Sequence, residues 1–470
     1  MINVMTNAQP GEGTARMPTL DFVIIGAGAA GEAAAHQARR RGASVAIVDR
    51  DLIGGSCAYW ACMPSKSLLH SAAVHAAGGE YSWPKAAARR DWMINRVERD
   101  YPDDSSRAEA LEKVGARVIR GAARILGLGR VEVRTGDGTL NLETRNLVLA
   151  LGSNSRVPTV EGLASIQAWT NREGTSADEL PRSLLVLGGG PTGVELAQVY
   201  SRYGVPTSIV DHNPRLLARD HPRNSAAVEL ALRAQGVTVR NGVRAVRARA
   251  GAGPNGAHAV DLDDGTSAFG HAVLLAIGRQ VPLAGIGLEN LGLDVSKEHP
   301  WPADGRLRVA DGLYVIGDPA GPEMHTHTAH YQGEMAIRMA LGDDVQPDYR
   351  AIPRCTYTDP EVAFVGLSLD EARTAGRDAF ELVADLATTA RGEVVDAAGH
   401  VTVIVDRADK VLLGVAIAGP AATETIHEAV LAIRARVPVA ILADTIHAFP
   451  TTARVMGGLF VDAARQLGLQ

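Results

Sequence analysis

The chain has 470 residues, of which 46% are hydrophobic, and it carries a formal net charge of −6. This length is enough for about three domains with sizeable cores, and the charge gives no sign of a nucleic-acid partner. No apolar run approaches the ~18 residues that a membrane-spanning helix needs, so no membrane association is expected.

The beginning of the chain and its cysteine content bear on where the protein resides. Residues 1–18 lack the apolar segment of a secretory signal, so we expect a short disordered leader there. Three cysteines cannot form a secreted disulfide framework. A reducing cytoplasm is therefore the predicted location.

The first predicted unit runs from residue 22 to 49, where FVIIG reads as a buried strand, GEAAAHQARRRG as a helix and SVAIVD as a second strand. The turn between the first strand and the helix contains a GxGxxG pattern formed by Gly26, Gly28 and Gly31. In a dinucleotide-binding unit these glycines allow a tight turn, close approach to a pyrophosphate and packing of the helix on the strand. Asp49 would then bond a ribose hydroxyl.

The segment GGSCAYWACMPSK at 54–66 places Cys57 and Cys62 five positions apart. In a regular helix their Cα atoms would be roughly 8.5 Å apart, whereas a disulfide needs ~4.4–6.8 Å. A bridge therefore requires a helix that is distorted or has not yet begun. A zinc site would need two further ligands, and Cys355 is the one other thiol, so a metal site is disfavoured. A structural staple and a redox pair both remain open.

The dinucleotide-binding pattern recurs with Gly188, Gly190, Gly193 and Asp211. Each acid follows the first glycine of its own unit by 23 residues. Two apolar strands that stop at a glycine come later, LVLALGS ending near Gly152 and VLLAIGR near Gly278, and both suit loops beside a cofactor. Two dinucleotides in one chain imply electron transfer between them, and FAD with a nicotinamide is the common pairing.

Taken together, these motifs resemble those of the FAD-dependent pyridine nucleotide-disulfide oxidoreductases. The resemblance covers roughly residues 20–465 and also includes the motifs IGDPAG at 316–321 and TDPEVAFVG at 358–366. It implies an α/β fold with two Rossmann-like dinucleotide-binding domains and a C-terminal α+β dimerisation domain. The expected domains are an FAD domain split into 19–155 and 282–345, an NAD(P) domain at 156–281 and an interface domain at 350–470.

The resemblance also implies roles for individual residues. FAD would bind the first fingerprint, with Asp318 on its ribityl chain and His327 packing at a helix start beside the flavin. Cys57 would be the interchange thiol and Cys62 the charge-transfer thiol. Lys66 and Glu195 would form an ion pair beside the flavin, near the point of hydride delivery.

The nicotinamide would bind the second fingerprint, where Asp211 bears on its identity. An acid at this position accepts bonds from a ribose 2′-hydroxyl and repels a 2′-phosphate, which favours NADH. His212 and Arg215 follow closely and would relax this preference, so NADPH stays possible.

The C-terminal segment departs from the family pattern. In the family this segment reads like HAHPTxSE, and its histidine and glutamate form an acid-base dyad that completes the partner subunit's active site. Here residues 447–454 read HAFPTTAR, which places Phe449 at the base position and Arg454 at the orienting position. Neither side chain exchanges a proton at neutral pH. His447 matches an earlier family histidine, and either a structural or a rescuing role is open for it.

The sequence therefore predicts a homodimeric enzyme that passes electrons from NAD(P)H through FAD to a Cys57–Cys62 disulfide. The final acceptor would be a small molecule that does not require the histidine-glutamate dyad. One alternative is direct transfer from the flavin to a quinone or dye, with non-essential cysteines. Another is chemistry like that of 2-ketopropyl-coenzyme M oxidoreductase/carboxylase, in which phenylalanine also replaces the histidine. A non-enzymatic nucleotide-binding scaffold is the third.

Overall fold

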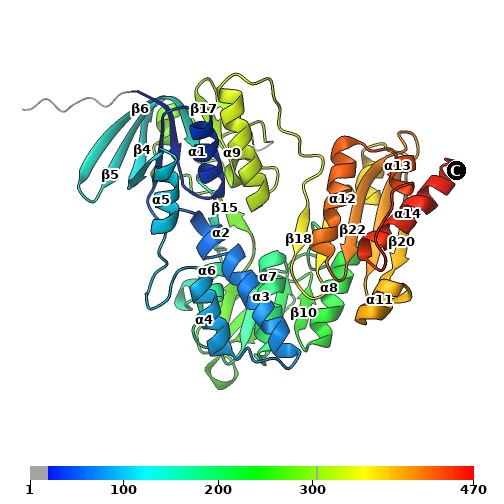
Figure 1. Cartoon of the computed structure of the whole chain (residues 1–470). Coiled ribbons are helices and arrows are strands. Elements are labelled where there is room, and N and C mark those ends of the chain that lie inside the picture. Colours follow the sequence, from blue (N-terminus) through cyan, green and yellow to red (C-terminus); the bar gives the residue numbers. More distant parts are fainter. Residues whose placement is uncertain (1–18, 303–304, 470) are drawn as a thin grey trace, which may run out of the picture.

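The computed structural model describes residues 19–302 and 305–469, so the predicted leader at 1–18 lies outside the described residues. The described chain forms three units, each built around its own sheet (Figure 1). Over these residues, no helix is long and apolar enough to cross a membrane.

The first unit is built on a parallel sheet with strand order β17-β6-β1-β2-β3. The antiparallel strands β4 and β5 extend from β6, and β16 pairs with β17. The strands of this unit are β1 (Leu20–Ile25), β2 (Val45–Asp49), β3 (Arg117–Arg120), β4 (Ala122–Gly127), β5 (Arg130–Thr135), β6 (Gly138–Leu149), β16 (Arg308–Ala310) and β17 (Leu313–Val315). Its helices are α1 (Ala29–Arg40), α5 (Ser105–Lys113) and α9 (Thr326–Ala340).

Helices α1 and α9 pack tightly against each other in this unit (Figure 1). A Cβ atom on Gly333 of α9 would lie 2.4 Å from the carbonyl oxygen of Ala30 in α1, so only glycine allows this approach. Strand β1 is an almost wholly apolar run because both faces of a parallel sheet are covered.

The second unit repeats the arrangement with a parallel sheet in the order β10-β9-β8-β14 and an antiparallel sheet β11-β12-β13. Its strands are β8 (Leu184–Leu187), β9 (Thr207–Asp211), β10 (Thr238–Asn241), β11 (Ala245–Arg249), β12 (His258–Leu262), β13 (Ser267–Gly270) and β14 (Ala272–Leu275). Its helices are α6 (Asn171–Ser176), α7 (Pro191–Arg202) and α8 (Pro222–Ala234). The strands β7 (Asn154–Ser155) and β15 (Arg279–Gln280) form a short antiparallel ribbon. This ribbon lies near the domain boundaries predicted from the sequence, and those boundaries stay a prediction.

Three helices that precede the second unit in sequence connect it to the first: α2 (Gly55–Tyr59), α3 (Cys62–Ala76) and α4 (Trp83–Met93). The apolar face of α3, including Leu68 and Leu69, is buried in the same cluster as Leu184 of β8. The cysteine segment therefore follows the first two strands of the first sheet in sequence, while helix α3, which Cys62 begins, packs against the second unit.

The third unit is an antiparallel sheet with strand order β18-β19-β22-β21-β20. Its strands are β18 (Arg354–Thr356), β19 (Val362–Gly366), β20 (Ala379–Asp385), β21 (His400–Asp406) and β22 (Leu412–Ala418). Its helices are α10 (Leu369–Thr374), α11 (Ala390–Val395), α12 (Ala422–Ala435), α13 (Val439–Ala443) and α14 (Thr452–Gln466). The predicted fold class, two Rossmann-like units followed by an α+β unit, is confirmed.

Candidate active site

The two cysteines of GGSCAYWACMPSK lie on either side of a break between two helices. Cys57 is in α2, which ends at Tyr59, and Cys62 is the first residue of α3. Between them Ala61 adopts φ −134° and ψ −94°, outside the helical region. The expected helix distortion is therefore confirmed, and it removes the geometric objection to a bridge between these residues.

The two thiols are free in this structure, and they differ in acidity. The pKa of Cys62 is lowered to about 6, mainly because the Cys57 thiol donates a hydrogen bond to its thiolate. The Thr326 hydroxyl, 3.4 Å from the Cys62 sulfur, and the Lys66 ammonium favour the thiolate as well, against the opposing effect of burial. The same hydrogen bond, together with burial, raises the pKa of Cys57. Cys62 is thus the sulfur that ionises first.

An ion pair joins the two nucleotide-binding units beside this pair of thiols. The Lys66 Nζ of α3 lies 2.7 Å and 3.0 Å from the two carboxylate oxygens of Glu195 in α7. Glu195 is 3% exposed, and its Oε1 also accepts a hydrogen bond of 2.9 Å from the backbone N–H of Tyr357. The Tyr357 ring lies under the Lys66 ammonium at 4.6 Å. The carboxylate therefore has the paired charge and the hydrogen bonds that a buried anion needs.

The first glycine fingerprint combines a close contact between helix and strand with an open backbone at the start of the helix. A Cβ atom on Gly31 would lie 1.9 Å from the Gly26 carbonyl oxygen, so this glycine is needed for packing of α1 on β1. A Cβ atom on Gly28 would meet one atom at 3.9 Å, which leaves the backbone at the start of α1 open. The Asp49 carboxylate accepts a hydrogen bond of 2.6 Å from the Ala27 N–H and closes the turn. These features fit a dinucleotide.

The second fingerprint repeats this geometry at the start of α7. A Cβ atom on Gly193 would lie 2.0 Å from the Gly188 carbonyl oxygen, whereas one on Gly190 would meet no atom of the described chain within 4 Å. Asp211 accepts a hydrogen bond of 2.8 Å from the Gly189 N–H. The structure thus has two similar cradles, each at the N-terminus of a helix.

Asp318 lies in a small polar network between the two units. Its carboxylate accepts a hydrogen bond from the Ser153 hydroxyl and lies 3.5 Å from the Arg279 guanidinium. Arg279 also donates to the Ser153 hydroxyl oxygen at 2.6 Å. Gly152 and Gly278, which precede Ser153 and Arg279, have φ values of +59° and +117°, and added Cβ atoms there would meet no described atom within 4 Å. The two predicted loops are therefore unobstructed by the chain itself.

Two of the three histidines in the segment HTHTAH at 325–330 form a stacked pair at the start of α9. The rings of His325 and His327 lie 5.0 Å apart and nearly parallel. Burial lowers the pKa of His327 to about 4, so this ring is neutral at physiological pH. Burial raises the pKa of the neighbouring Glu323, but its contacts with His325 and Arg354 outweigh this effect and lower it to about 2. Over the described residues, no group of three or more potential ligand side chains is arranged to hold a metal ion.

The C-terminal residues predicted for the site do not meet the cysteines within one chain. Arg454 lies in the first turn of α14 and Phe449 lies just before this helix, which is far from α2 (Figure 1). Phe449 is 73% exposed. His447 has both ring nitrogens engaged in its own unit, Nε2 with Glu428 at 2.8 Å and Nδ1 with the Thr445 carbonyl at 3.0 Å. A second copy of the chain would be needed to bring this segment to a thiol pair.

Three polar residues near the site carry no clear signal in the sequence. Thr326 touches Cys62, Asn171 bonds the backbone between the cysteines, and Arg279 joins Ser153 to Asp318. Thr326 lies inside HTHTAH and Arg279 is the last residue of VLLAIGR, so both lie within short sequence motifs. Asn171 has no such motif, and only its position in space reveals it.

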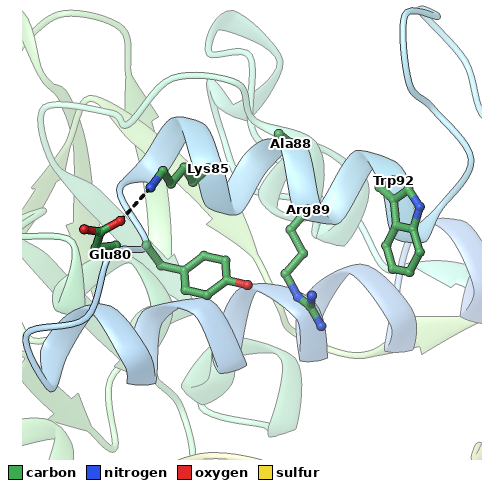
Figure 2. Close-up of a pocket in the computed structure, with 6 residues that line it drawn as sticks. Glu80, Lys85, Ala88, Arg89 and Trp92 are labelled. Atoms are coloured by element: carbon green, nitrogen blue, oxygen red, sulfur yellow. Dashed lines mark hydrogen bonds and ion pairs between the residues drawn. The ribbon is translucent and has the colours of Figure 1, made fainter.

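An open hollow of about 570 Å³ lies over α4, and none of the predicted site residues lines it. Figure 2 shows Arg89 and Trp92 extending from this helix, with Lys85 paired to Glu80 at the other end. The thiol pair is therefore not at this hollow.

The fold and the site together define a class of enzyme in which two dinucleotide-binding units flank a dithiol. The family model described as pyridine nucleotide-disulphide oxidoreductase matches residues 20–333, and the model of its dimerisation domain matches residues 352–459. The chain belongs to the pyridine nucleotide-disulphide oxidoreductases. The resemblance seen in the motifs is thus confirmed at the level of the family.

Curated relatives and solved structures agree with this assignment. Dihydrolipoyl dehydrogenase 3 of Pseudomonas aeruginosa is 30% identical over 95% of this chain and 98% of its own length. The dihydrolipoyl dehydrogenase of Chlorobaculum tepidum is 31% identical over 95% and 98%. The LpdA structure from Mycobacterium tuberculosis has a TM-score of 0.84 and 26% identity, covering 95% of this chain and 100% of that one. A copper(II) complex of the HOCl-induced flavoprotein disulfide reductase RclA from Escherichia coli has a TM-score of 0.84 and 25% identity, covering 95% and 99%.

Proposed function

We propose that the protein is a homodimeric NADH-dependent flavoprotein that transfers electron pairs through the Cys57–Cys62 pair to a small-molecule acceptor. The observation that carries this proposal is a thiol that ionises near pH 6 close to an ion pair between α3, the helix that Cys62 begins, and α7, the helix that begins at the second cradle. Cys62 and Lys66 lie one helical turn apart on α3, and Lys66 is paired with Glu195 of α7. A nearby cation and a helix N-terminus both stabilise a thiolate.

The first cradle is the proposed FAD site. Gly26, Gly28 and Gly31 would admit the pyrophosphate, Asp49 a ribose, and Asp318 the ribityl chain. When bound there, FAD supplies a two-electron relay between a nicotinamide and a disulfide. Gly152 and His327 would border this cofactor, as predicted from the sequence. The open backbone at Gly28 supports the assignment.

The second cradle is the proposed NADH site, formed by Gly188, Gly190 and Gly193 with Asp211, and Gly278 would border it. The contacts of Arg215 support NADH over NADPH. Its guanidinium donates to three backbone carbonyls at 2.8–2.9 Å, so it is already engaged within the turn and would have to leave these bonds to reach a 2′-phosphate.

An anaerobic titration of the holoprotein tests the proposed electron path. We expect the wild-type subunit to take up two electron pairs from NADH, one on the flavin and one on the dithiol, whereas Cys57→Ser takes up only one. NADPH should titrate the protein far more slowly than NADH. If Cys57→Ser consumes as much NADH as the wild type and keeps full reductase activity, electrons go directly from the flavin to the acceptor and the cysteines are not part of the path.

The C-terminal segment limits the choice of acceptor. We infer that Phe449 and Arg454 replace the family's acid-base dyad and that the partner subunit presents them to the thiol pair. A positioned acid-base group is worth about 10²–10⁴ in rate, so a lipoamide-type substrate should react slowly. An acceptor that needs no histidine-mediated protonation would not suffer this loss. Carboxylation chemistry of the 2-ketopropyl-coenzyme M type belongs to the same group of alternatives, with Phe449 excluding protons from a carbanion.

A panel of acceptors separates these possibilities. Lipoamide needs proton transfer, a quinone reports direct flavin chemistry, and copper(II), the metal in the RclA complex, needs no proton. With copper, one dithiol would reduce two copper(II) ions to copper(I), forming the disulfide and releasing its protons. The double variant Phe449→His with Arg454→Glu should raise lipoamide activity by roughly 10²-fold or more. No gain in this variant would show that the missing dyad is not what limits lipoamide turnover.

A further inference from the structure

The carbonyl group of Trp60 lies in the break between α2, which ends at Tyr59, and α3, which begins at Cys62. In an α-helix each carbonyl accepts a hydrogen bond from the N–H four residues later. For Trp60 that residue is Pro64, which has no N–H. The next carbonyl, that of Ala61, does find its partner, the Ser65 N–H at 3.1 Å. Pro64 therefore removes the backbone donor that a continuous helix would offer to the Trp60 carbonyl.

Helix α6 supplies the missing donor from 111 positions away in the sequence. The Asn171 side-chain amide donates to the Trp60 carbonyl oxygen at 2.7 Å. The Thr175 hydroxyl lies 3.3 Å from the same oxygen, but it has a single hydrogen and a closer acceptor, the Asn171 carbonyl at 2.9 Å. Asn171 is thus the principal partner of the turn.

The orientation of the Asn171 amide is set by a second contact. The Ser155 hydroxyl donates to Asn171 Oδ1 at 2.7 Å, which directs the NH₂ group toward Trp60. Ser155 belongs to β7, where it pairs with Arg279 of β15 in the ribbon beside the second unit. The turn between the cysteines is therefore anchored to the connection between the two nucleotide-binding units.

The Trp60 side chain is also held. Trp60 is 7% exposed, and the guanidinium of Arg172, the residue after Asn171, lies 4.1 Å from the centroid of its ring. The Tyr101 ring contacts it edge-on, with the ring centroids 5.5 Å apart. Backbone and ring are thus fixed from the same helix, and they hold a turn in which Ala61 has non-helical dihedrals.

We propose that Asn171 is a positioning residue that holds the turn between Cys57 and Cys62 so that their sulfur atoms meet. This inference rests on the proposed function of the pair as a redox-active dithiol. A disulfide forms only within a narrow range of Cα separations and sulfur geometry. A turn freed from Asn171 samples more conformations, so the sulfurs meet less often and the dithiol becomes favoured over the disulfide. Asn171 would thereby set the reduction potential of the pair.

The variant Asn171→Asp removes the donor and also adds a negative charge, so the uncharged variant Ser155→Ala is measured beside it. Asn171→Asp keeps the shape of the side chain and the acceptor for Ser155, but near neutral pH a carboxylate cannot donate to the Trp60 carbonyl. The matched control is Asn290→Asp, because the Asn290 amide also donates to a backbone carbonyl, that of Ile125 at 2.7 Å, outside the cysteine segment.

The measurement is the thiol-disulfide equilibrium of the holoprotein in dithiothreitol redox buffers, read as the fraction of alkylated cysteines by mass spectrometry. In each exchange one dithiothreitol molecule gives two electrons and two protons to the protein disulfide. The protein S–S bond breaks as dithiothreitol forms its own cyclic disulfide. We expect Asn171→Asp to shift the equilibrium constant roughly tenfold toward the dithiol, equal to about 30 mV in a two-electron couple. Ser155→Ala, which removes only the orienting bond, should shift it in the same direction by a smaller factor.

The control and the proposed function are judged separately. Asn290→Asp should leave the equilibrium constant unchanged. An unchanged constant in both Asn171→Asp and Ser155→Ala, or an equal shift in Asn290→Asp, would overturn the role of Asn171. The NADH titration of Cys57→Ser decides whether the cysteine pair takes part in turnover. The thiol-disulfide equilibrium in dithiothreitol does not depend on that result, so the two proposals can fail separately.

Discussion

At the scale of single residues, the Thr326 hydroxyl is a second neutral donor, besides the Cys57 thiol, to the sulfur that ionises first. It lies 3.4 Å from Cys62 at the first position of α9, so the thiolate has both a hydroxyl and a helix N-terminus beside it. Because the folded-state pKa of Cys62 is lowered, its thiolate is present above about pH 6 and is lost as the pH falls through that value. A thiolate at neutral pH is what a charge-transfer role for this cysteine requires.

The first prediction follows from this contact. Thr326→Val keeps the side-chain shape but removes the hydroxyl, and a hydrogen bond to a charged group is worth about 1.5–3 kcal/mol. We expect the pKa of Cys62 to rise by roughly one unit or more. The pH dependence of the thiolate-flavin charge-transfer band in the two-electron-reduced protein reports this shift.

A matched control lies two positions along the same helix. Thr328 is buried in α9 as well, and its hydroxyl has no hydrogen-bond partner in the described part of the chain. Thr328→Val should leave the titration midpoint where it is. Equal midpoints for Thr326→Val and the wild type would mean that the hydroxyl does not stabilise the thiolate.

At the scale of elements, different glycines of the second cradle have different roles. One is needed for packing of α7 on β8, and another leaves the backbone open to a ligand. Gly193 is needed because α7 crosses β8 so closely that a Cβ atom would lie 2.0 Å from the Gly188 carbonyl oxygen. Gly190 has an extended backbone that alanine also adopts, and a Cβ atom there would meet nothing in the described chain within 4 Å. Gly193 is therefore required for packing of the helix on the strand, whereas Gly190 leaves space in which a ligand could lie.

The second prediction compares these two positions. Gly193→Ala should lower the free energy of unfolding by about 1–3 kcal/mol, because neither the helix nor the strand can move without losing other contacts. Gly190→Ala should leave stability nearly unchanged and raise the Kd for NADH about tenfold, which equals about 1.4 kcal/mol. Denaturant unfolding measures the first effect and a fluorescence titration with NADH the second. Equal affinity of Gly190→Ala and the wild type for NADH would argue against a pyrophosphate at this turn.

Some elements of the fold and the site could be predicted from the sequence, and others could not. Both Rossmann-like units were predictable because strand, glycines, helix and acid are consecutive, and their spacing reflects local geometry. Cys57, Cys62 and Lys66 could also be predicted as neighbours, because they lie in a single short motif. The contact of Asn171 with Trp60 was not predictable, since it depends on how α6 packs against a turn 111 positions away. Such contacts arise from the register between distant elements, which no local pattern encodes.

At the scale of the whole molecule, the chain by itself forms half of the proposed site. The thiols, the ion pair and both cradles lie in the first two units, while Phe449 and Arg454 lie on the third, distant from α2 (Figure 1). This third unit matches the family's dimerisation domain, which supports a homodimer. Its surface exposes several large apolar side chains, namely Leu431, Ile441, Ile446 and Phe449. A subunit contact would remove such apolar side chains from water.

The third prediction tests this assembly. Ile446 is 97% exposed in the single chain and stands three positions before Phe449. In a dimer that buries this segment, Ile446→Asp would place an unpaired carboxylate in an apolar contact, which costs several kcal/mol. We expect the dimer dissociation constant to rise roughly 10²-fold or more, as measured by sedimentation velocity over a range of protein concentrations. Leu230→Asp is the control, because Leu230 is 72% exposed on α8, outside the dimerisation domain, and should leave the dimer intact. A dimer that tolerates Ile446→Asp as well as Leu230→Asp would place the subunit contact elsewhere, and the partner's Phe449 could then not reach the thiols.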